Sequence, residues 1–136
     1  MTRERQDITE DFYVGNHKVI RDTVYDRDGA LFDLTSAEAT FFLLDEDDGT
    51  VYLTKSSSEP TEIEVDDVNS LVIVYLIPSD TLRLNAPDLY GTFRYQIHVY
   101  DQNGNEETIT TGRINIFQSP LSGRARKDTV SAYLPA

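Results

Sequence analysis

Short runs of β-branched and aromatic residues recur along the chain, and each run ends in residues that favour a tight turn. In three of these turns Gly follows Asp or Asn, at Asp28-Gly29, Asp48-Gly49 and Asn103-Gly104. The predicted strands cover residues 11–14, 18–25, 37–44, 50–55, 61–65, 71–77, 92–100 and 107–117. This succession is typical of an antiparallel sandwich. We therefore predict an all-β, immunoglobulin-like antiparallel β-sandwich of seven or eight strands with extended N- and C-terminal arms.

The strand patterns also indicate which side chains form the core. Residues 92–100 alternate cleanly between apolar and polar side chains, and residues 71–77 are apolar throughout, as in a strand buried on both faces. Residues 107–117 alternate imperfectly, with apolar positions at Ile109, Gly112, Ile114 and Ile116. The predicted core consists of Phe12, Ile20, Val24, Leu34, Phe41, Leu43, Val72, Val74, Leu76, Phe93, Tyr95, Ile97 and Ile114.

The 136 residues fit one domain with a polar segment at each end. We predict an N-terminal arm at residues 1–10, a β-sandwich domain at residues 11–117 and an extended C-terminal arm at residues 118–136. A short helix is expected after Pro78, with Ser79 as its N-cap. The first residues lack the apolar run of a signal peptide, and no apolar stretch is long enough to span a membrane.

The net charge of −12 narrows the range of partners. Nucleic acids and anionic membranes bind through Lys and Arg, so we expect neither as a partner. The C-terminal arm is the exception, because it is basic and also carries apolar side chains. That mixture suits an arm that lies across a neighbouring protein, and a solvated tail is the alternative. The candidate partner-binding residues are Leu121, Arg124, Arg126, Lys127, Val130, Tyr133 and Leu134.

The side chains that usually carry chemistry do not form a recognisable motif. The chain has no Cys, which excludes disulfides, thiolate metal sites and a Cys nucleophile. His17 and His98 lack partners at metal-ligand spacing and read as surface or packing residues. The acidic turns at 26–29, 45–49 and 101–105 place oxygen ligands at alternate positions, as calcium loops do, but hairpin turns require the same residues. We predict no catalytic residues, no metal and no cofactor.

The order of several short motifs resembles a family of small β-sandwich proteins encoded by tailed phages. The turn Asp26-Arg27-Asp28-Gly29 leads to Phe32-Asp33-Leu34-Thr35 and then to an aromatic-rich strand. Further along, the chain reads Gly91-Thr92-Phe93-Arg94-Tyr95, then the turn at 101–104, then Gly112-Arg113-Ile114-Asn115-Ile116. This order is similar to the N-terminal domain of the phage baseplate upper protein. The resemblance covers residues 11–117 and implies binding and assembly rather than catalysis.

The resemblance and the arms together predict a structural role in a virion. We expect a capsid decoration or cement protein of a tailed phage or virus, attached through its arms. Its partners would be other virion proteins, namely the major capsid protein or tail and baseplate proteins, and copies of itself in a homo-oligomer. The alternatives are a tail, baseplate or fibre-attachment protein, or a carbohydrate- or receptor-binding adhesion module.

Overall fold

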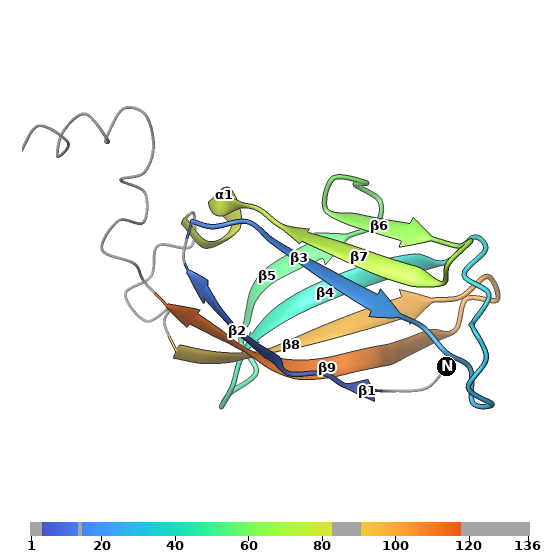
Figure 1. Cartoon of the computed structure of the whole chain (residues 1–136), viewed down its shortest axis with the longest axis horizontal. Helices are drawn as coiled ribbons and strands as arrows, with labels where there is room; N and C mark the ends of the chain where they lie inside the picture. Colours follow the sequence, from blue (N-terminus) through green and yellow to red (C-terminus); the bar gives the residue numbers. More distant parts are fainter. Residues whose placement is uncertain (1–3, 14, 83–90, 118–136) are drawn as a thin grey trace, which may run out of the picture.

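The computed structural model describes residues 4–13, 15–82 and 91–117, and these residues form two β-sheets packed face to face (Figure 1). The described elements are β1 (Glu4–Arg5), β2 (Ile8–Tyr13), β3 (Lys18–Thr23), β4 (Glu38–Asp45), β5 (Val51–Ser56), β6 (Ile63–Asp66), β7 (Leu71–Leu76), α1 (Pro78–Leu82), β8 (Gly91–Tyr100) and β9 (Glu106–Phe117). All the strand regions predicted from the sequence are present, with boundaries shifted by a few residues.

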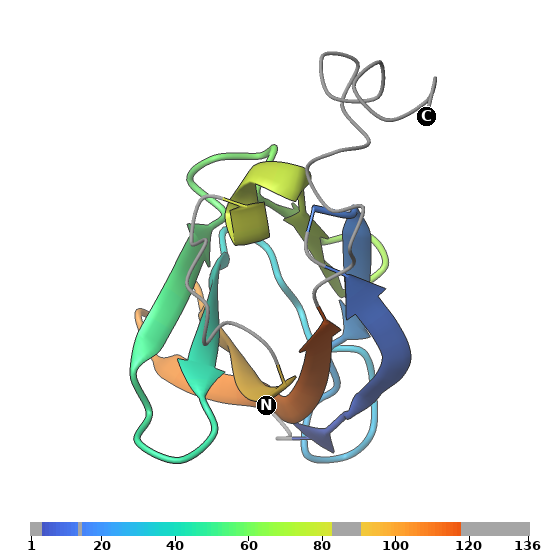
Figure 2. The ribbon, with the colours of Figure 1, turned by 90° about the vertical axis from the view of Figure 1, so that its left-hand side faces the viewer.

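The larger sheet has the order β1-β9-β8-β4-β5, and β2 also pairs with β9. The smaller sheet has the order β3-β7-β6. This is an immunoglobulin-like β-sandwich, as predicted. The pairing is antiparallel except at one edge, where β1 and β2 run parallel to β9. Figure 2 shows the strands enclosing the interior, with α1 lying at one end of the sandwich.

The core lies between the two sheets and contains every side chain that the sequence analysis assigned to it. On β8 the alternation holds throughout, since Phe93 and Tyr95 are buried while Arg94 is exposed. The rings of Phe41 and Tyr95 stack at a centroid distance of 5.9 Å. Burying one large apolar side chain stabilises the folded state by about 1.5–3 kcal/mol. The alternating positions therefore determine which face of each strand points into the core.

The helix after β7 begins differently from the prediction. The side chain of Asp80 accepts a hydrogen bond of 2.7 Å from the backbone N–H of Ile77, so Ile77 is the N-cap and Pro78 the first helical residue. The assignment of Ser79 as N-cap is therefore wrong. Asp80 is buried, and the ammonium of Lys55 on β5 lies 2.7 Å from its carboxylate. This buried ion pair ties α1 to the larger sheet.

The N-terminal region also differs from the sequence analysis, which places residues 1–10 in an arm. Residues 4–5 and 8–10 instead lie in β1 and β2. Their polar side chains gave no strand pattern, because a strand added at a sheet edge is held by backbone hydrogen bonds. The C-terminal arm, 118–136, lies outside the described residues. Within the described part of the chain, no helix has the length and apolar character needed to cross a membrane.

Candidate functional site

The predicted partner-binding residues cannot be placed, because all of them lie outside the described residues. They are Leu121, Arg124, Arg126, Lys127, Val130, Tyr133 and Leu134, and they stay a prediction. His98 lies on the outer face of the larger sheet, with Nδ1 3.0 Å from Glu106 and Nε2 3.0 Å from Gln96. Its ring meets that of Phe42 edge-on at 5.0 Å. His98 is thus held by packing and hydrogen bonds, and His17 is exposed.

The acidic turns use their carboxylates to shape the backbone. In each turn the first Asp (Asp26, Asp45 or Asp101) accepts two backbone N–H groups on one oxygen. These hydrogen bonds stabilise the charged form and lower the pKa of Asp45 and Asp101, with the N–H of Asp48 and of Asn105 as the respective largest causes. Among the described residues, no three acidic or histidine side chains form a group that could hold a metal ion.

A more specific arrangement is found where the N-terminal segment, residues 4–8, lies along β9. The same register extends from Glu4 opposite Thr110 to Ile8 opposite Ile114, so β1 and the start of β2 continue one parallel alignment along β9. The N–H of Gln6 donates to the carbonyl of Thr111 at 2.9 Å. The Asp7 carboxylate accepts the N–H of Arg113 at 3.0 Å. This bond is the largest cause of a lowered pKa at Asp7.

A glycine in β9 makes this close approach possible. A Cβ atom at Gly112 would lie 1.9 Å from the carbonyl oxygen of Gln6. Any side chain at this position would therefore exclude the N-terminal segment or push it outward. The hydroxyl of Tyr95 donates to the same carbonyl from the core side. Burial, followed by the charges of Asp22 and Asp7, raises the pKa of Tyr95, so the hydroxyl stays protonated as a donor.

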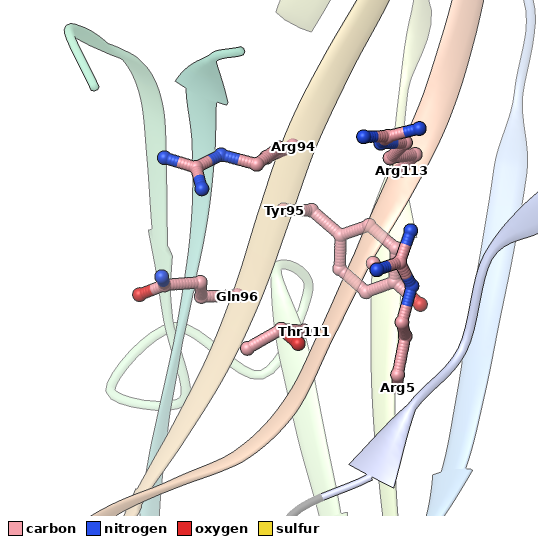
Figure 3. A pocket seen from close by; sticks show the side chains of 7 residues that line it. Arg5, Arg94, Tyr95, Gln96, Thr111 and Arg113 are labelled. Carbon is pink, nitrogen blue, oxygen red and sulfur yellow. The ribbon is translucent and has the colours of Figure 1, made fainter. Parts of the chain in front are cut away.

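Beside the N-terminal segment, three arginines line one cavity of about 200 Å³ on the outer face of the larger sheet. The register brings them together, because Arg94 on β8 lies opposite Arg113 on β9 and Arg5 lies opposite Thr111. Gln96, Thr111, Tyr95 and Gly112 complete the lining. In Figure 3, Arg94 and Gln96 extend to one side, Arg113 and Arg5 lie on the other, and Tyr95 and Thr111 lie between them.

The cavity concentrates positive charge on a strongly acidic protein. It holds three of the seven lysines and arginines in the described part of the chain. Arg5 pairs through Nε with Asp7 at 3.4 Å, and Arg113 pairs through Nε with Glu46 at 2.9 Å. Among the described residues, Arg94 has no ion-pair or hydrogen-bond partner, and the terminal Nη groups of the other two arginines make no hydrogen bond. The cavity can therefore accept a further anionic group.

Sequence reasoning missed this site for two reasons. Arg5 was assigned to an arm, so its place beside β9 could not be foreseen. Arg94 and Arg113 share a face only because a bulge between Ile97 and His98 shifts the register of β8 and β9 by one residue. The one available signal was the imperfect alternation of residues 107–117.

Comparisons with known proteins add little to this geometry. No protein-family model matches the chain, and no curated protein matches it. Among solved structures, it is similar to the filamin domain of Lin-41, with 17% sequence identity and a TM-score of 0.41. The alignment covers 82% of this chain and 86% of that one. At this identity and TM-score, the similarity gives no basis for transferring a function.

Proposed function

We propose that this chain is a non-enzymatic structural protein of a tailed phage or virus, and specifically a capsid decoration or cement protein held on the particle by its C-terminal arm. The observation that carries the proposal is the attachment of residues 4–8. This polar segment is held on β9 by backbone hydrogen bonds and by a glycine that makes room for its backbone. It is an example, within the chain itself, of an arm that binds by strand addition.

The fold and the charge are consistent with this role. An immunoglobulin-like β-sandwich is typical of non-enzymatic domains, and a body with net charge −12 suits an exposed, soluble position. The basic C-terminal arm, with Arg124, Arg126 and Lys127, complements acidic surfaces. The order of motifs that resembles phage β-sandwich proteins is the reason for proposing a virion.

The energetics require the C-terminal arm to bury substantial surface. Ordering one flexible residue costs roughly 1–2 kcal/mol of conformational entropy, so an arm of 19 residues cannot attach through a few charge pairs. Side chains such as Tyr133 and Leu134 would have to act as anchors in pockets of the partner. Many copies on a lattice would then make attachment effectively permanent through multivalency. A tail or baseplate position would use the same contacts in fewer copies.

The test is to delete residues 118–136 and to measure occupancy on particles that lack the protein. The truncated protein should keep its melting temperature and lose its place on the particle. The matched control keeps the arm's length and composition but scrambles its order, and it should also fail to bind. Full occupancy by the truncated protein would contradict attachment through this arm. Specific binding on a glycan array, without binding to particles, would favour an adhesion module instead.

A further inference from the structure

We propose that the arginine cavity binds a carboxylate carried by a partner protein, and that this binding is coupled to docking of the N-terminal segment on β9. The inference concerns a site separate from the C-terminal arm and is independent of the virion role. It rests on the positions of Arg5, Arg94 and Arg113 around one cavity.

The hydrogen-bond donors in the cavity exceed the acceptors that reach them. Asp7 and Glu46 each contact one Nε atom, which leaves the Nη groups of Arg5 and Arg113 and the whole guanidinium of Arg94 available. Three guanidinium groups line the cavity, and two carboxylates, those of Asp7 and Glu46, pair with them. Guanidinium groups bind carboxylates through two parallel hydrogen bonds, which are stronger than neutral ones. The side chains of Arg5 and Arg113 are 62% and 55% exposed, so a partner can reach them.

A protein carboxylate fits this cavity better than a nucleic acid does. Nucleic-acid binding needs cations along an extended track, whereas these three arginines surround a single cavity of about 200 Å³ on an acidic body. Two carboxylates of the chain itself, Asp7 and Glu46, already pair with arginines there. A Glu or Asp side chain from a partner would repeat this chemistry at Arg94.

The cavity is complete only when the N-terminal segment is docked. Arg5 belongs to β1, and its place opposite Thr111 depends on the hydrogen bonds of Gln6 and Asp7 and on the space left by Gly112. A carboxylate bound in the cavity is attracted by the charge of Arg5 only while the segment is docked. It therefore binds the docked state more tightly than the undocked state. By thermodynamic reciprocity, the carboxylate must also stabilise docking of the segment.

The ligand is tested by calorimetric titration of the full chain at low ionic strength, where exposed ion pairs are least screened. The probes are a blocked peptide of alternating Glu and Gly, the same peptide with Gln for Glu, and inorganic phosphate. We expect only the Glu peptide to bind, with at least tenfold weaker binding in Arg94→Ala. Arg27→Ala removes the same charge from the turn at 26–29, which does not line the cavity, and should bind nearly as the parent protein does. Equal binding by the two variants, or binding of phosphate alone, would overturn the proposed ligand.

The coupling is tested with Asp7→Ala. This variant removes a negative charge beside the cavity, so electrostatics alone would tighten binding of the Glu peptide. It also releases the N–H of Arg113 and loosens the N-terminal segment, so coupling requires weaker binding. In the parent protein, amide hydrogen exchange at Gln6 should slow when the peptide is added. Unchanged or tighter binding by Asp7→Ala, or unchanged exchange at Gln6, would show that the cavity and the segment are independent.

Discussion

The hairpin of β8 and β9 and the N-terminal segment lie side by side in one sheet, yet different kinds of interaction determine their positions. In the hairpin, alternating side chains such as Phe93, Tyr95 and Ile97 are buried and decide which face points inward. In the N-terminal segment, backbone hydrogen bonds and one glycine of the receiving strand decide the position. Side-chain burial is visible as a period in the sequence, whereas strand addition at an edge is not.

The largest effect is expected in the hairpin, from Phe93→Ala. Phe93 is 3% exposed, and its ring packs edge-on against Tyr52 at 5.5 Å. Truncation of a buried aromatic side chain leaves a cavity and costs about 3–5 kcal/mol. Denaturant unfolding should show this loss, whereas Thr54→Ala at an exposed position of β5 should change stability by less than about 0.5 kcal/mol. Similar stabilities for the two variants would mean that the alternation does not specify the hairpin.

The next largest effect is expected at the ion pair between Lys55 and Asp80. Both side chains are almost fully buried, so Lys55→Met removes the ammonium group that lies 2.7 Å from the Asp80 carboxylate in the interior. Breaking a buried pair in this way costs about 3 kcal/mol. The double variant Lys55→Met with Asp80→Asn should recover part of that loss, because neither remaining side chain is charged. A double variant as unstable as Lys55→Met would indicate that the geometry at α1, rather than charge, accounts for the effect.

A smaller loss is expected when Gly112 is replaced by Val, and it should be largest in the N-terminal segment. The new side chain would occupy the position of the Gln6 carbonyl and would also press on the ring of Tyr95. Loss of the hydrogen bonds to Gln6 and Asp7 corresponds to about 1 kcal/mol each. Amide exchange should become fast at Gln6 while Ile97, in the middle of β8, stays protected. Fast exchange at both positions would mean that the segment and the hairpin unfold as one unit.

The strands and the core could be predicted from the sequence because both depend on the period of the apolar side chains. The features that depend on backbone geometry, namely the bulge in β9 and the start of α1, could not. The buried apolar positions of β9 change from odd-numbered (Ile109) to even-numbered (Ile114) residues because the strand contains a bulge. Without that bulge, Arg113 would lie opposite Phe93 and point into the core. The helix start was misassigned for a related reason, since Asp80 reaches back to Ile77 through a side-chain hydrogen bond that has no periodic signature.

The smallest effect is a pH dependence of docking by the N-terminal segment. The N–H of Arg113 donates to Asp7 and lowers its pKa below the ordinary value of 3.8. Because the folded-state pKa is the lower one, Asp7 stabilises docking above the ordinary pKa, and this contribution disappears as the pH falls through the folded value. Amide exchange at Gln6, corrected for its intrinsic pH dependence, should therefore lose protection below about pH 4. Asp7→Asn cannot titrate, so its protection should be lower at neutral pH and should not change across this range. A parent protein whose protection at Gln6 is equally flat would show that backbone hydrogen bonds alone hold the segment on β9.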